Sequence, residues 1–194
     1  KDADGPRYRS AFREIARLLK LPFVITPNTN LIIADIAPDQ RATVAAILAS
    51  NNIPFPAGMT ATRKVAHACV ALPTCGLSLS EGERVFGGVL DGIDGILREL
   101  KLEDEPILIR MTGCPNGCAR PYNSDIGLVG KTKDKYTVFL GGRVFGDRLN
   151  FIYRDMVPTD EVVSALVPVF RYFRDDRLPG ETFGLAWLMG CNVE

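Results

Sequence analysis

Four cysteines of this 194-residue chain fall into two close pairs whose spacing could hold a metal cofactor. Cys69 and Cys75 lie in the segment CVALPTC, and Cys114 and Cys118 flank the turn-forming run PNG. The fifth cysteine of the chain, Cys191, stands alone near the C-terminus. Thiolate sulfurs bind soft and borderline metals, so the paired cysteines indicate either metal ligation or disulfide formation.

Three kinds of site compete for these four cysteines. Disulfides suit small secreted domains that cannot build a core, whereas this chain has the residues for a core and shows no secretion signal. Structural zinc usually takes cysteines separated by two residues, and the gaps here are five and three. An iron–sulfur cluster needs four thiolates and tolerates more varied spacing. The spacing therefore favours the cluster and leaves the other two open.

The run between the second pair of cysteines is suited to a tight loop. Pro115 fixes one φ angle, and Asn116 and Gly117 permit a left-handed bend. Such a loop can aim backbone N–H groups at the sulfurs, and these hydrogen bonds tune the potential of a cluster. An Asn-Gly pair can also be only a hairpin turn, but the flanking cysteines favour a ligand loop.

The composition is that of an ordinary globular protein, with 46% apolar and 24% charged residues. Its 23 basic and 23 acidic residues cancel, so net charge gives no argument for a nucleic-acid or anionic-membrane partner. No apolar run approaches the ~20 residues of a membrane helix. We expect a cytoplasmic protein that binds neither nucleic acid nor a membrane. Because the chain does not begin with Met, it can be a piece from which a targeting segment is absent.

Apolar periodicity predicts a small first module over residues 6–60. A helix is expected over 8–20, where residues at helical spacing share an apolar face. Two short strands over 23–26 and 31–36 are joined by the turn-forming run PNTN, and Pro38 opens a second helix that reaches residue 50. The order helix, strand, strand, helix describes a compact unit, and the Pro-rich segment after it indicates a connection.

Residues 61–194 are predicted to form a second, larger domain of the α+β class. Ser80 and Glu83 have the spacing of a capping box for a long amphipathic helix that ends near residue 100. Strands are expected over 107–111, 126–129 and 136–140, and a last helix over 159–173. The apolar face of the long helix should pack on this sheet.

The cysteine-containing segments resemble a known family. ACVALPTCGLSLSEGER and MTGCPNGCARPYNSDIGLVGK are similar to the two cluster motifs of the sirohaem and 4Fe-4S sulfite and nitrite reductases, in the C-terminal half of those enzymes. TPNTNLIIADI resembles their upstream sirohaem-contacting segment. The resemblance implies an α+β fold, with a ferredoxin-like half-module at 6–60 and a mixed-sheet domain at 61–194 that binds a 4Fe-4S cluster and sirohaem.

The same resemblance implies a role for individual residues. The cluster ligands would be Cys69, Cys75, Cys114 and Cys118, without Cys191. Cys118 would also bridge the cluster to the sirohaem iron, and Cys118 and Asn116 would be the catalytic positions. Sirohaem contacts are implied for Asn28, Asn30, Thr112, Gly113, Asn116 and Arg120. Thr29 stands where the family typically has Gln, so the sequence departs from the family at this polar position.

Sulfite is favoured over nitrite as the substrate because VALPTC, CARPY and LGGRVFGDRLNFIYRDMVP are similar to the sulfite branch. The resemblance thus implies six-electron reduction of sulfite to sulfide. The implied partners are sulfite, an N-terminal half of the enzyme, and an NADPH flavoprotein or ferredoxin as electron donor. Because the family's N-terminal half supplies most cofactor-binding and anion-binding cations, this chain alone is expected to be inactive. The alternatives are a nitrite reductase and a non-catalytic iron–sulfur electron-transfer module.

Three further charged or titratable residues lie just before the first cysteine pair. His67, the one histidine of the chain, is interpreted as a strand residue near the cluster rather than as a ligand or proton donor. Arg63 and Lys64 are interpreted as solvated surface charges, and the alternative is that they face the carboxylates of the sirohaem.

Overall fold

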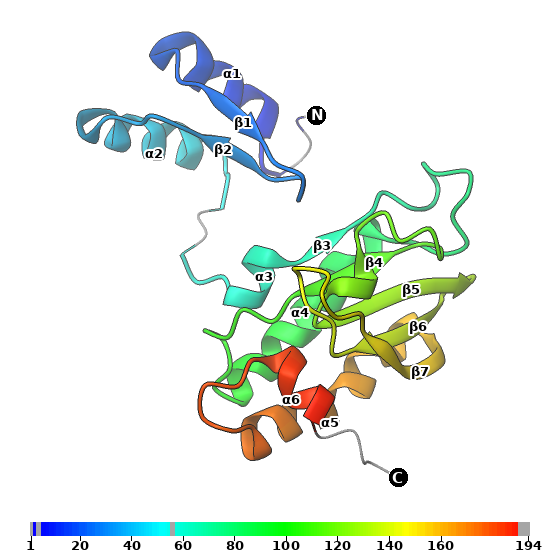
Figure 1. Ribbon diagram of the computed structural model, residues 1–194. Helices are drawn as coiled ribbons and strands as arrows, with labels where there is room; N and C mark the ends of the chain where they lie inside the picture. The colour runs from blue at the N-terminus through cyan, green and yellow to red at the C-terminus, as the bar shows by residue number, and fades with distance from the viewer. Residues whose placement is uncertain (1, 3–4, 55–56, 190–194) are drawn as a thin grey trace. The chain divides into compact units, whose positions relative to one another are not determined.

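The computed structural model describes residues 2, 5–54 and 57–189, so Cys191 lies outside the described residues. The chain forms two compact units, Lys1–Gly58 and Met59–Glu194 (Figure 1). Within the described residues, no helix is both long and apolar enough to cross a membrane.

The first unit has the predicted order of helix, strand, strand and helix. Its elements are α1 (Tyr8–Leu19), β1 (Phe23–Ile25), β2 (Leu31–Ile33), a 3-10 turn (Pro38–Gln40) and α2 (Arg41–Ser50). The two strands are antiparallel, with Phe23 opposite Ile33, and they end earlier than predicted. Both helices contribute to a small core made of Ala11, Ile15, Leu21, Val44 and Ile47.

The second unit is built on a mixed sheet, as predicted, and this sheet has five strands. The strands run in spatial order from β3 to β7: β3 (His67–Ala68), β4 (Ile109–Thr112), β5 (Ile126–Thr132), β6 (Lys135–Leu140) and β7 (Phe151–Pro158). The first three strands are parallel, and the β5–β6 and β6–β7 pairs are antiparallel. The sequence did not predict β7, because this edge strand is largely exposed and its register shifts break the alternation of apolar residues.

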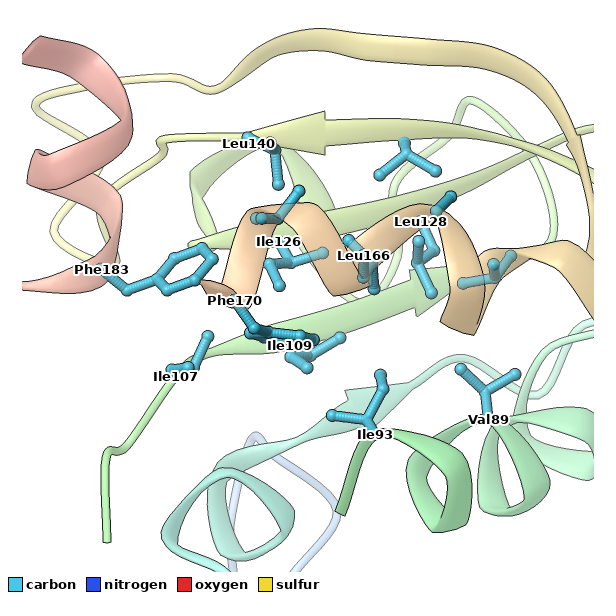
Figure 2. Packing of buried hydrophobic residues seen from close by; sticks show 14 of the residues in the cluster. Val89, Ile93, Ile107, Ile109, Ile126, Leu128, Leu140, Leu166, Phe170 and Phe183 are labelled. Atoms are coloured by element: carbon cyan, nitrogen blue, oxygen red, sulfur yellow. The ribbon is translucent and has the colours of Figure 1, made fainter. Parts of the chain in front are cut away.

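Two helices, α4 (Glu83–Glu99) and α5 (Val162–Asp176), contribute to the main apolar core together with the sheet. Figure 2 shows Val89 and Ile93 of α4 and Leu166 of α5 pointing into one apolar layer with Ile126 and Leu128 of β5. A 3-10 turn (Thr159–Glu161) precedes α5, and the short helices α3 (Ala61–Val65) and α6 (Phe183–Met189) were not predicted. This layer fixes the strands whose ends carry the cysteines.

The capping box predicted from Ser80 and Glu83 is wrong. Helix α4 begins at Glu83 after Gly82, and no side chain caps its N-terminus. Ser80 is instead buried, and its hydroxyl donates to the carbonyl of Thr132 and, at 3.3 Å, to that of Lys135. The tertiary contact with the β5–β6 hairpin therefore takes the hydroxyl that the local pattern assigned to the helix.

The solvated state predicted for Arg63 is also wrong. Arg63 Nε donates to the Asp94 carboxylate at 2.5 Å, and Arg63 Nη2 donates to Asp91 at 2.6 Å. Thr60 donates a further hydrogen bond of 2.7 Å to the buried Asp94, which lies on α4. The pairing holds α3 against α4 just before the first cysteine pair, whereas Lys64 is exposed.

Candidate functional site

Two loops that contain the cysteines begin at the ends of neighbouring parallel strands. Cys69 follows β3 directly, and its N–H donates to the Met111 carbonyl of β4 at 3.0 Å. Cys114 lies two residues after β4. Because the carboxyl ends of parallel strands meet at one edge of a sheet, the two loops open at the same edge. We call residues 69–82 the first cysteine loop and residues 113–123 the second cysteine loop.

Gly113 joins the two cysteine loops. Its N–H donates to Cys69 Sγ at 3.4 Å, and its carbonyl accepts the N–H groups of Leu79 and Ser80, each at 2.9 Å. A Cβ at position 113 would lie 2.6 Å from Ala71 Cβ and 2.6 Å from the Ser80 carbonyl oxygen. Only glycine fits here, and its backbone N–H supplies the kind of hydrogen bond to sulfur that the loop sequence predicts.

The second cysteine loop is a closely tied turn. Gly117 has a φ of 67°, and its carbonyl accepts the Arg120 N–H at 2.7 Å. The Tyr122 hydroxyl donates to the Pro115 carbonyl at 2.8 Å. Burial raises the pKa of Tyr122, with a further contribution from Cys114, so the phenol is neutral and donates. These bonds fix the direction in which Cys114 and Cys118 leave the backbone.

The four cysteines of the two loops are free thiols with different exposure. Cys114 is buried, Cys69 and Cys75 are partly buried, and Cys118 is exposed, as is the neighbouring Asn116. Among the described residues, no three His, Cys, Asp or Glu side chains are grouped so that they could hold a metal ion. The structure brings both cysteine loops to one sheet edge, and the ligand role of the four sulfurs stays a prediction.

Three basic residues, His67, Arg110 and Arg120, interact electrostatically near the second cysteine loop. His67 of β3 is in register with Arg110 of β4, as expected of a strand residue near this site, and both are buried. Burial lowers the pKa of His67, and the positive charges of Arg110 and Arg120 lower it further. Sequence reasoning missed Arg110. Its signal was a charged residue between the core residues Ile109 and Met111, on a strand that is covered on both faces.

The predicted sirohaem contacts of the second unit differ in accessibility. Arg120 is exposed and has a φ of 58°. Thr112 and Gly113 are buried, and the Thr112 hydroxyl donates to the Cys114 carbonyl at 3.1 Å. The predicted contacts of these residues with sirohaem remain predictions.

Asn28 and Asn30 lie in the turn of the first unit that joins β1 and β2. The Thr26 N–H donates to the Asn30 carbonyl at 2.9 Å, and the Asn30 N–H donates to Thr26 Oγ1 at 3.0 Å. Thr29, at the position where the family typically has Gln, has a φ of 60° in this turn. The turn therefore holds a fixed shape, and the predicted contacts of Asn28 and Asn30 remain predictions.

Tyr136 of β6 connects the end of the first cysteine loop to the sheet through a hydrogen bond. Its ring is fully buried, and its hydroxyl donates to the Glu81 carbonyl at 2.9 Å. Burial raises the pKa of Tyr136 to about 12. The neutral phenol is therefore the form that the folded chain favours.

We expect Tyr136→Phe to lower the free energy of unfolding by about 1 kcal/mol at neutral pH, because one hydrogen bond is lost. The neutral Tyr136 contributes its full stability below the unfolded pKa of about 10 and loses it as the pH rises through about 12. By pH 11.5 the parent should have lost about 2 kcal/mol more of its free energy of unfolding than the variant. Urea unfolding of both proteins at pH 7, 10 and 11.5 measures this difference, and parallel losses would contradict it.

Comparison with known proteins finds one matching family model and a set of similar proteins. Residues 105–183 match the family model described as the nitrite and sulphite reductase 4Fe-4S domain. The matched residues include the second cysteine pair, Cys114 and Cys118. The chain is 45% identical over 180 residues to the NADPH sulfite reductase haemoprotein beta-component of Afipia carboxidovorans. It is 40% identical over 184 residues to the protein of that name from Staphylococcus epidermidis.

These alignments cover nearly all of this chain but a minor part of each relative. They include 93% and 95% of the chain and 31% and 32% of the two relatives. Among solved structures, the Mycobacterium tuberculosis NirA protein matches with a TM-score of 0.79 and 25% identity. That match covers 92% of this chain and 34% of NirA. Most of this chain is therefore similar to about a third of each of these reductases, and residues 105–183 are similar to the nitrite and sulphite reductase 4Fe-4S domain.

Proposed function

We propose that this chain is the C-terminal cofactor-binding part of a sulfite reductase haemoprotein. The observation that carries the proposal is the junction at Gly113, where the loops of both cysteine pairs meet at one edge of a parallel sheet. The similarity to beta-components of NADPH sulfite reductase over most of the chain supports sulfite as the substrate. Because the chain spans about a third of those relatives, the activity would belong to the longer protein.

The donor set fits an iron–sulfur cluster in its chemistry. Cys69, Cys75, Cys114 and Cys118 would hold it as thiolates, which iron–sulfur clusters require. The Gly113 N–H already donates to one of these sulfurs, and a hydrogen bond of this kind stabilises the negative charge on a thiolate. A bound cluster with sirohaem would supply single electrons for the reduction of sulfite, and the overall reaction would take six electrons and seven protons to convert sulfite into hydrosulfide and three waters.

The exposed end of the second cysteine loop is the side that would face the sirohaem. Cys118 would bridge the two cofactors, and Asn116 and Arg120 would lie beside the macrocycle, since all three are exposed there. Thr112 and Gly113 would contribute from the loop base, and Asn28 and Asn30 from the first unit. The tied turn keeps Cys118 in a fixed direction, which a shared ligand requires.

The electron donor that we propose is an NADPH-dependent flavoprotein subunit. The support for it is the name of the relatives, which are haemoprotein components of an NADPH sulfite reductase. We also propose a cytoplasmic location, where glutathione and thioredoxin keep cysteine thiols reduced.

We expect the chain alone to bind the cluster but not to sustain sulfite reduction. An anion at a cluster-linked haem needs cations aimed at it, and the net charge of this chain is zero. The test is sulfide production with reduced methyl viologen, for the chain loaded with both cofactors. The assay is repeated after addition of the separately produced N-terminal two-thirds of the Afipia carboxidovorans relative.

Sulfide production only by the reconstituted pair would support the proposal. Reduction of nitrite in preference to sulfite would assign the chain to a nitrite reductase instead. The chain would be an electron-transfer module if it binds the cluster but binds no sirohaem, even after the N-terminal part of the relative is added. Sulfide production by the chain alone at the rate of the pair would show that the required cations lie on this chain.

A further inference from the structure

Arg110 is a fully buried cation at the base of the second cysteine loop. Its side chain is 1% exposed, and it lies among the largest fully buried side chains of the described chain. One terminal nitrogen donates to the Ala119 carbonyl at 3.3 Å, next to Cys118, and Nε has no hydrogen-bond partner. The neighbours Ile109 and Met111 belong to the apolar core, so the alternation of the strand puts Arg110 on the opposite face.

The fold makes room for this guanidinium beside the loop. Arg110 pairs with Gly127 of β5, and a Cβ at Gly127 would lie 2.5 Å from the Pro121 carbonyl oxygen of the second cysteine loop. The loop therefore packs directly on the strands beside Arg110. A glycine next to a buried arginine lets the loop backbone, rather than a side chain, cover the charge.

No carboxylate compensates the charge of Arg110 within the described part of the chain. None of the ion pairs there includes Arg110, although five other arginines form at least one. The surroundings of Arg110 disfavour its charged form. Burial lowers the pKa of Arg110, and the positive charge of Arg120 lowers it further. An isolated buried charge is expensive, so a buried cation that is retained usually has a negative group nearby.

We propose that Arg110 is the buried counter-charge of the cysteine site: it offsets the negative charge that four thiolates and a bound cluster bring to the ends of β3 and β4. This inference rests on the proposed function, because the negative group is the cluster with its cysteine ligands. Arg110 is a positioning residue through its bond to Ala119, and its charge favours the reduced cluster, which carries one more electron. Loss of that charge makes reduction harder and the cluster easier to remove.

The decisive variant is Arg110→Met, which keeps much of the side-chain length and removes the charge. In the chain without iron, the variant should unfold at the same temperature as the parent or at a higher one, because an uncompensated buried charge is removed. In the chain loaded with iron and sulfide, the variant should show a more negative midpoint potential and faster loss of iron to a chelator. Arg110→Lys keeps the charge and should restore most of the potential.

Arg148→Met is the matched control. Arg148 also donates to backbone carbonyls, Gly141 at 2.7 Å and Gly142 at 3.4 Å, but the negative charge of Asp125 acts in its vicinity. Its loss should leave the cluster potential unchanged. An unchanged potential in Arg110→Met, or an equal loss of stability with and without the cluster, would overturn the counter-charge role. A parent chain that binds no cluster would overturn the proposed function instead, and this inference with it.

Discussion

Cys114→Ser is expected to abolish binding of the iron–sulfur cluster. Cys114 is the buried member of the set, and it lies where the second cysteine loop leaves β4, so no other sulfur can replace it without rebuilding the loop. A serine hydroxyl is a much poorer iron ligand than a thiolate. Iron and acid-labile sulfide, measured per chain after anaerobic reconstitution, should fall from about four of each to a small residue.

Cys191→Ser provides the control for this variant. The resemblance to the sulfite and nitrite reductases completes the ligand set without Cys191, so its replacement should leave iron and sulfide at the parental level. Far-ultraviolet circular dichroism of both variants reports whether the chain has folded. Equal losses of iron in two folded variants would show that the ligands have been assigned wrongly.

Gly113→Ala should destabilise the second unit strongly and prevent the two cysteine loops from meeting. The added methyl group would overlap Ser78 Oγ and lie 2.6 Å from both Ala71 Cβ and the Ser80 carbonyl oxygen. Backbone atoms on both loops must therefore move, and the hydrogen bonds of Gly113 to Cys69, Leu79 and Ser80 would be lost. We expect a loss of about 3 kcal/mol in the free energy of unfolding, together with failure to load the cluster.

The matched control is Gly95→Ala in the interior of α4, where an added Cβ meets nothing within 4 Å. The same chemical change should there raise stability by about 0.5 to 1 kcal/mol, because alanine favours the helix. Urea unfolding compares the two variants, and iron analysis follows the cluster. A Gly113→Ala chain that is as stable as the parent and loads normally would show that the loops are not held together at this residue.

The sequence by itself determined the features that depend on neighbours along the chain. The Pro-Asn-Gly run between two cysteines predicted a tight loop, and Gly117 has the positive φ that this turn requires. Apolar periodicity located α1, α4 and α5, because a helix with one buried face repeats its apolar residues every three to four positions. The resemblance to the sulfite and nitrite reductases could be recognised because these motifs occur in the order found in that family.

Only the tertiary structure decided which distant groups serve the site. Ser80 has the local signature of a helix cap, but a contact with the carbonyl of Thr132, far along the chain, takes its hydroxyl. Arg63 has the local signature of a surface charge, but Asp94, on the next long helix, pairs with it. In both cases a residue far along the chain takes the side chain that the local pattern assigned to a helix end or to solvent. The periodicity of apolar residues carries no information about such distant partners.

The same reason explains why the sequence did not reveal that Gly113 joins the two cysteine loops or that Arg110 is buried beside them. A glycine before a cysteine and an arginine inside a short strand have no distinctive local pattern. Their importance arises where β3 and β4 lie side by side, which brings residue 69 next to residue 113 and places His67 beside Arg110. Contacts between chain segments more than 40 residues apart set both the steric fit of Gly113 and the charge that surrounds Arg110.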